Sequence, residues 1–95
     1  AALPLLARAE ELAQAGHITG ASTRNWTAYG AEVTLPETCP DWQRALLCDP
    51  QTSGGLLVAV APDAAEDWLR RLHDAGYPLS AIVGRVEEGQ GIAVT

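Results

Sequence analysis

The segment 49–55 carries the residues in this sequence that are best suited to chemistry, Asp49-Pro50-Gln51-Thr52-Ser53-Gly54-Gly55. Two glycines behind two hydroxyl residues leave successive backbone N–H groups free to converge into a concave nest, which attracts anions such as phosphate. The alternative is a tight loop in which Thr52 and Ser53 bond their own backbone. Spacing alone favours this alternative, because no P-loop lysine follows and the glycines precede a predicted strand rather than a helix.

Other groups that could react or bind metal are less promising. Cys48 follows two leucines and precedes Asp49, and an apolar, anionic setting disfavours the reactive thiolate, so we expect an inert, packed thiol. The remaining histidines and cysteine, His17, His73 and Cys39, show no paired spacing of the kind that zinc sites use. We therefore predict neither a side-chain metal site nor a secreted disulfide framework, and expect a reduced, cytoplasmic setting.

Composition narrows the function classes. The chain has 95 residues, 47% of them apolar, and a net charge of −6, which fits one folded domain with a modest core. Its six basic residues are scattered apart from Arg70 and Arg71, so we expect no nucleic-acid partner. The longest apolar run, 56–61, is too short to span a membrane. An anionic ligand such as ATP would need backbone N–H groups, metal ions or another domain.

Three segments have the signals of helices that would position segment 49–55. Apolar residues recur at helical spacing over 3–15, and Gly16 follows as a C-cap. A helical turn is predicted from Pro40 and Asp41 to Leu47. A stronger helix is predicted from Pro62 to Gly76, with Trp68 on its core-facing side.

The remaining segments read as strands and loops. Residues 17–30 lack a convincing period and are predicted to form an ordered loop. Short strands are predicted at 32–35, at 56–60 as a buried strand, and at 80–86 and 92–94 as a hairpin. The predicted fold class is α+β, a mixed β-sheet with helices packed against it.

The run 49–57, reading D-P-Q-T-S-G-G-L-L, resembles the C-terminal signature of selenophosphate synthetases (selenide, water dikinases). Residues 24–30, beginning Arg24-Asn25, resemble that family's R-N followed by an aromatic residue and a glycine. Residues 3–15 and 82–86 are also similar to the family, so the resemblance covers nearly the whole chain. By resemblance, the fold is the C-terminal domain type of the aminoimidazole ribonucleotide synthetase superfamily.

The resemblance implies a single domain, 1–95, that forms the C-terminal part of a longer enzyme. That enzyme makes selenophosphate from selenide and ATP and releases AMP and phosphate, with Mg²⁺ bridging the phosphates. The family's reactive cysteine or selenocysteine, lysine and metal-binding aspartates lie outside this sequence, so no catalytic residue is expected here and the fragment alone is expected to be inactive. Its partners would be its own N-terminal ATP-binding domain, which binds most of the ATP and Mg²⁺, and a second copy of the parent.

What the resemblance transfers to this chain is a set of residues that would line the active cleft and contact substrate. They are Asp49, Gln51, Thr52, Ser53, Gly54, Gly55, Arg24 and Asn25. Two alternative functions stay open. The chain could belong to another ATP-using enzyme of the same superfamily, or it could be a non-catalytic interaction module.

Overall fold

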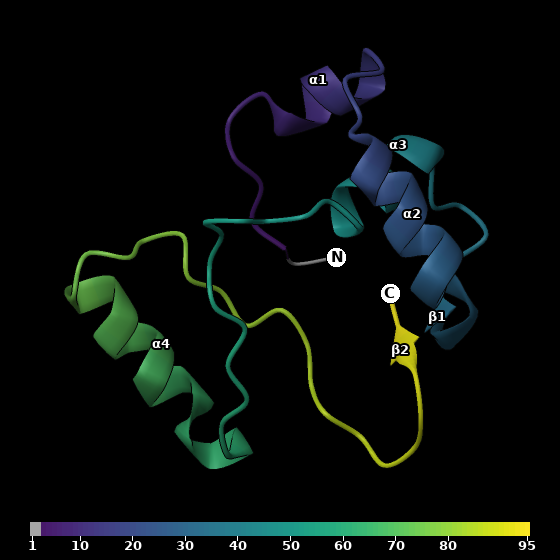
Figure 1. Ribbon diagram of the computed structural model, residues 1–95. Helices are drawn as coiled ribbons and strands as arrows, with labels where there is room; N and C mark the ends of the chain where they lie inside the picture. The colour runs from purple at the N-terminus through teal and green to yellow at the C-terminus, as the bar shows by residue number, and fades with distance from the viewer. Residues whose placement is uncertain (1–2) are drawn as a thin grey trace. The chain divides into compact units, whose positions relative to one another are not determined.

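The chain divides into two compact units in a computed structural model that describes residues 3–95. The larger unit contains residues 5–54 and 89–95. The smaller unit contains residues 55–88 together with residues 3 and 4. Figure 1 shows the elements of each unit along the chain.

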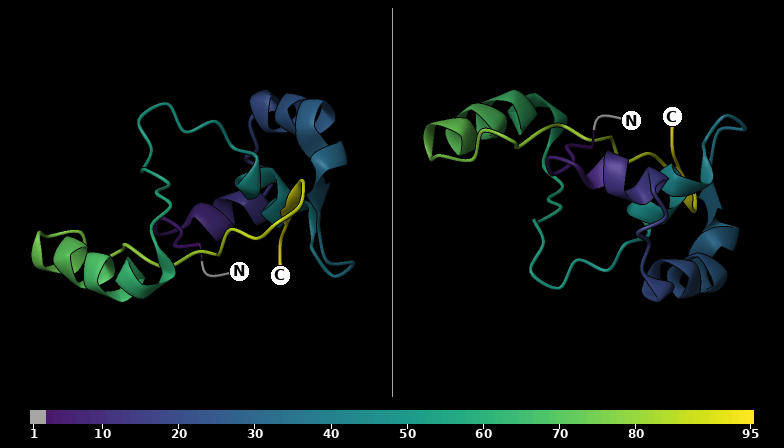
Figure 2. Two further views of the ribbon diagram at one scale, coloured as in Figure 1. Left: turned by 90° about the horizontal axis from the view of Figure 1, so that it is seen from below. Right: turned by 90° about the horizontal axis from the view of Figure 1, so that it is seen from above.

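The larger unit is built mainly from three helices. They are α1 (Ala9–Gln14), α2 (Gly20–Tyr29) and α3 (Asp41–Leu47). Both α1 and α2 contact α3, and the three helices lie together in the views of Figures 1 and 2. The side chains of Ala13 and Ser22, each 2% exposed, are the buried ones among residues 3–95. The core of this unit is therefore small, and one of its two members is polar.

Local signals placed the ends of two helices correctly. α1 ends before Gly16, whose N–H bonds the Ala13 carbonyl while the His17 N–H bonds the Leu12 carbonyl, the pair of bonds that closes a Schellman cap. α1 begins only at Ala9, six residues later than the apolar stripe indicated. The predicted turn at 41–47 is confirmed as α3.

The predicted loop over 17–30 was wrong, because residues 20–29 form α2. Thr19 caps this helix, with its Oγ1 accepting a hydrogen bond from the Ser22 N–H at 3.2 Å. Most side chains of α2 are polar, so the hydrophobic period that marks a surface helix is weak. The usable signal in the sequence was the threonine cap ahead of two alanines, which are strong helix formers.

The sheet consists of two short parallel strands in the described residues, so the predicted mixed sheet and the C-terminal hairpin were wrong. β1 (Val33–Thr34) follows the 3₁₀ turn η1 (Gly30–Glu32) and pairs with β2 (Ile92–Ala93). Val33 lies opposite Ile92, and Thr34 lies opposite Ala93. The predicted strands at 32–35 and 92–94 are thus confirmed in shortened form, but their partners are each other.

The smaller unit has one helix, α4 (Ala65–Asp74), preceded by the 3₁₀ turn η2 (Pro62–Ala64). This confirms the predicted helix, which stops at Gly76 through a second Schellman cap. Its Trp68 was predicted to be core, but its side chain is 52% exposed. Within residues 55–88 no strand covers that face.

The predicted strands at 56–60 and 80–86 do not form. Leu56, Leu57 and Val58 are 93%, 86% and 68% exposed, so the apolar run is not buried either. A strand is stabilised by hydrogen bonds to a neighbouring strand, and neither segment has such a partner within residues 55–88. Both strand predictions were therefore wrong, because an apolar composition does not by itself provide a partner strand.

The α+β class is confirmed only at the level of four helices and a two-stranded parallel sheet. Among residues 3–95, no helix is long and apolar enough to cross a membrane.

Candidate functional site

The carboxylate of Asp49 connects the predicted site segment 49–54 to the start of α2. Its Oδ1 accepts hydrogen bonds from the hydroxyls of Thr19 at 3.2 Å and Ser22 at 3.3 Å. Its Oδ2 accepts a hydrogen bond from the side-chain amide of Gln51 at 2.8 Å. Two hydroxyls from the start of α2 and one amide from the loop therefore meet at a single half-buried carboxylate.

Sequence reasoning missed Thr19 and Ser22, which complete this cluster. The two hydroxyl oxygens are also 3.1 Å from each other, so the cluster is continuous from the helix cap to the loop. Ser22 is the buried polar side chain of the unit, and its hydroxyl is satisfied there. The spacing of a capping threonine and a serine three residues later was the signal that could have found them.

A second contact fixes the residue before the loop. Asn25 donates a hydrogen bond from Nδ2 to the backbone carbonyl of Cys48 at 2.8 Å. Helical spacing places Asn25 on the same side of α2 as Ser22 and Trp26. Arg24 falls on the opposite side and is exposed. The structure therefore joins Asn25 to the loop but does not join Arg24 to it.

The rest of the predicted site is an exposed turn. The Gly54 N–H bonds the carbonyl of Gln51 at 3.3 Å. A Cβ at position 54 would lie 2.5 Å from the Gln51 Cβ, so this turn requires glycine. The hydroxyls of Thr52 and Ser53 are exposed and make none of the hydrogen bonds found among residues 3–95. They are free to contact a ligand. Gly55 belongs to the smaller unit and is also exposed.

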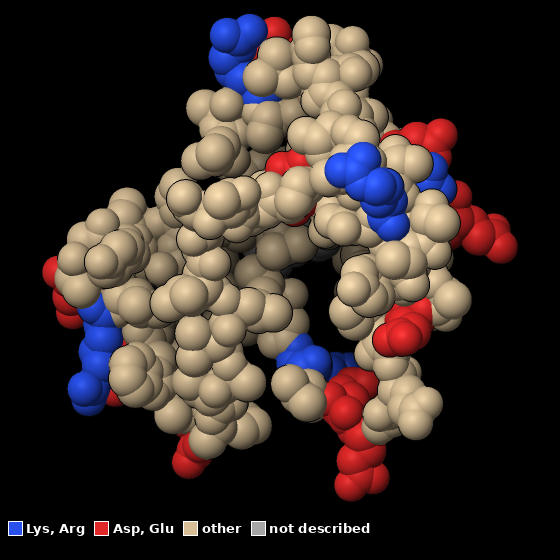
Figure 3. Space-filling model, viewed as in Figure 1, with Lys and Arg blue, Asp and Glu red and all other residues tan. Residues whose placement is uncertain are grey.

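The charged side chains that pair in the described residues do so close in sequence. Five ion pairs form, and acidic groups lie beside arginines on the face drawn in Figure 3. They are Arg8–Glu11, Arg44–Asp41, Arg70–Asp67, Arg71–Asp67 and Arg85–Glu87. None of them involves Asp49, so the loop is held by neutral donors rather than by an ion pair.

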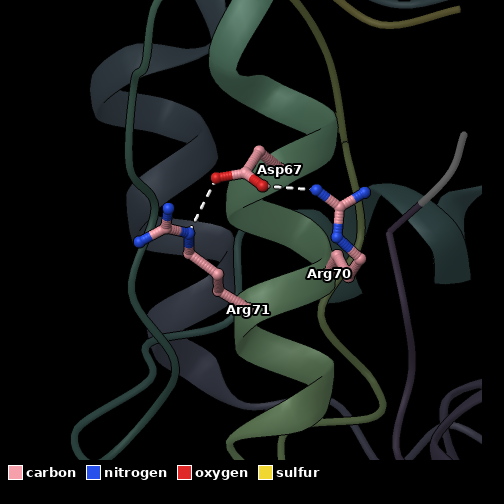
Figure 4. A network of polar contacts seen from close by, with 3 residues as sticks. All are labelled: Asp67, Arg70 and Arg71. Atoms are coloured by element: carbon pink, nitrogen blue, oxygen red, sulfur yellow. Dashed lines mark hydrogen bonds and ion pairs between the residues drawn. The ribbon is translucent and has the colours of Figure 1, made fainter.

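Asp67, on α4 of the smaller unit, has a carboxyl whose pKa is shifted. Figure 4 shows Asp67 between Arg70 and Arg71, and its Oδ2 accepts a hydrogen bond from the Arg71 Nε at 2.7 Å. Hydrogen bonds from Arg70 and then Arg71 lower the pKa of Asp67. The two arginines are largely exposed and the Asp67 side chain is half-buried, so this network stabilises the helix surface.

A cavity of about 160 Å³ lies between α2 and α3. Its lining includes Trp26, Asp41 and Arg44. The Arg44 guanidinium stands 5.2 Å from the centre of the Trp26 ring and 3.0 Å from an Asp41 oxygen. Both the cation and the aromatic face are thus already used within the protein, which disfavours this cavity as a ligand site.

The two cysteines are free and half-buried. Cys39 makes weak contacts with the Pro40 carbonyl and the Gln43 side chain at 3.8 Å. Residues 3–95 contain no group of three or more His, Cys, Asp or Glu side chains that could hold a metal ion.

Comparison with known proteins identifies relatives over most of the chain. It is 58% identical over 88 residues to the selenide, water dikinase of Rhizobium meliloti, and 51% identical over 88 residues to that of Burkholderia pseudomallei. The enzyme of Pseudomonas straminea is 47% identical over 89 residues. These matches cover 93–94% of this chain but only 25% of each relative.

No family model matches the chain, and no solved structure matches it. These relatives confirm the predicted resemblance to selenide, water dikinases. The chain spans about a quarter of the length of the curated relatives that it matches. The chain is therefore homologous to one part of the selenide, water dikinases.

Proposed function

We propose that this chain serves as the C-terminal part of a selenide, water dikinase, which makes selenophosphate from selenide and ATP and releases AMP and phosphate. The observation that carries the proposal is the 58% identity over 93% of the chain to an enzyme of that name. Related sequences this similar keep the same fold, and the turn at 51–54 of the larger unit is exposed.

The part of the work assigned to this chain is recognition rather than chemistry. All six of its basic residues are arginines, and it has no lysine. The turn at 51–54 offers exposed hydroxyls and backbone N–H groups, which suit the oxygens of a phosphate group. We therefore assign Thr52, Ser53 and Gly54 to the wall of the active cleft. We assign Gly55, the next residue in the sequence, to the same wall.

ATP and Mg²⁺ would be bound mainly by the enzyme's N-terminal domain, the proposed partner of this chain within one protein. The described residues of this chain do not provide a carboxylate cluster for a metal ion. We accordingly assign Mg²⁺ no ligand here and derive no step through it. The apolar segment 56–60, exposed in its own unit, is the surface that such a partner would cover.

A chimeric enzyme tests the proposal directly. The 88 matched residues of the Rhizobium meliloti enzyme would be replaced by this chain. Selenophosphate and AMP would then be followed by phosphorus NMR with ATP, Mg²⁺ and selenide present. We expect both products at a rate within about tenfold of the parent enzyme, because 58% of the matched residues are identical.

A matched control separates a failed graft from a failed function. The same chimera with the sequence of residues 51–54 scrambled should be folded and inactive. A folded chimera that consumes ATP without forming selenophosphate would refute the assignment to selenide chemistry. Equal activity of the scrambled version would refute the role given to the loop.

A further inference from the structure

The side chain of Asp49 has little capacity left for a ligand. Both carboxylate oxygens accept hydrogen bonds, from two hydroxyls on Oδ1 and from an amide on Oδ2, at 2.8–3.3 Å. One of the donors, Ser22, is 2% exposed, so it cannot turn to water without opening the helix contact. This carboxylate is directed into the protein, whereas Thr52 and Ser53 are exposed.

Charge leads to the same conclusion. Asp49 takes part in none of the ion pairs of residues 3–95, so no arginine neutralises it there. Direct contact between an uncompensated carboxylate and a phosphate oxygen is repulsive. Neutral hydroxyl and amide donors, in contrast, stabilise a carboxylate and fix its direction. The chemistry of the cluster thus suits an anchor better than a phosphate contact.

We propose that Thr19 and Ser22 are positioning residues, which hold the turn at 51–54 in place through the carboxylate of Asp49. Asp49 then acts on the ligand only through the loop, and Thr52 and Ser53 are the side chains that meet it. The anchoring is inferred from the hydrogen bonds of Asp49 within this chain. The effect of the anchoring on binding of a phosphate-bearing substrate rests on the proposed function.

The first test measures loop order in the full 95-residue chain by nitrogen-15 relaxation. In the parent chain, the amides of 51–54 should have order parameters near 0.85, the value of rigid backbone. Ser22→Ala and Thr19→Ala should lower them to about 0.6 or less. Thr19→Ser keeps the hydroxyl and should restore rigidity. Thr27→Ala is the matched control, because its hydroxyl bonds only the Thr23 carbonyl within α2.

Three results would overturn the anchoring. They are a loop already mobile in the parent chain, a loop that stays rigid in Ser22→Ala, and a loop that loosens equally in Thr27→Ala. The last would mean that any weakening of α2 has the same effect. Because Thr19 also caps α2, Ser22→Ala, which removes a hydroxyl bonded to Asp49 and leaves the Thr19 cap in place, decides the point if Thr19→Ala is poorly folded.

The second test uses the chimeric enzyme. Ser22→Ala should raise KM for ATP about three- to tenfold and leave kcat within about twofold. The reason is that a displaced loop would lose a contact that stabilises the bound substrate and the transition state equally. Thr19→Ser and Thr27→Ala should leave both constants unchanged. An inactive chimera with a rigid, anchored loop would refute the proposed function alone. An active chimera whose KM is unaffected by Ser22→Ala would refute the positioning role alone.

Discussion

Gly91 is expected to be irreplaceable, because a side chain there would collide with the backbone of η1. Gly91 precedes β2 with a φ of +86°, and a Cβ added there would lie 2.6 Å from the backbone carbonyl oxygen of Glu32. That carbonyl belongs to η1, directly before β1. Any side chain at 91 must therefore push the two paired strands apart or distort the turn.

Gly16 provides a control with the same backbone angle. Its φ is +89°, but a Cβ there meets nothing within 4 Å. Alanine in a left-handed conformation costs about 1–2 kcal/mol, partly offset by the lower entropy of the unfolded chain. Gly16→Ala should therefore lose about 1 kcal/mol. Gly91→Ala carries the same strain plus about 1–3 kcal/mol for the overlap with a backbone atom that cannot rotate away.

Urea unfolding followed by tryptophan fluorescence measures the difference, since Trp26 and Trp42 both lie in this unit. The free energy of unfolding should be highest for the parent chain, lower for Gly16→Ala and lowest for Gly91→Ala. The two variants should differ by at least about 1 kcal/mol. Equal losses in the two variants would show that the strand contact at Glu32 does not constrain position 91.

Three further outcomes are expected. The carboxyl of Asp67 should titrate below its usual range by carbon-13 NMR and move back up in Arg70→Gln and Arg71→Gln. Since its folded pKa is lowered, its stabilising effect is present above the unfolded pKa and lost as pH falls through the folded one. Asn25→Ala should lower the free energy of unfolding by about 1 kcal/mol, and Asn25→Asp by more, because a carboxylate would face the Cys48 carbonyl; equal urea midpoints would contradict this. In the chimera, Thr52→Ala should raise KM for ATP about two- to tenfold, whereas Arg24→Ala, on the far side of α2, should change it less than twofold.

Sequence reasoning succeeded where a structural signal is local. The glycines after α1 and α4 and the proline before α3 act on their own neighbours through backbone angles and missing N–H groups, so their positions could be predicted. It failed for α2, because a polar helix has a weak hydrophobic period. Its remaining evidence, the cap at Thr19, is a single residue.

Strand predictions failed for a different reason. The run at 56–60 has the composition of a buried strand, yet composition does not supply the neighbour whose N–H and C=O groups complete a ladder. β1 and β2 show the reverse case. Two weak segments more than fifty residues apart in the sequence are joined because the fold brings them together.

The sequence by itself determined the family resemblance, the helix ends and the loop at 49–55, since each depends on residue types in a short window. The tertiary structure alone decided how that loop is held. Asp49, Thr19 and Ser22 come from two segments about thirty residues apart, and no local pattern reports a hydrogen bond between them. It also separated Asn25, which faces the loop, from Arg24, which does not, because that distinction arises only when the segment becomes a helix with two sides.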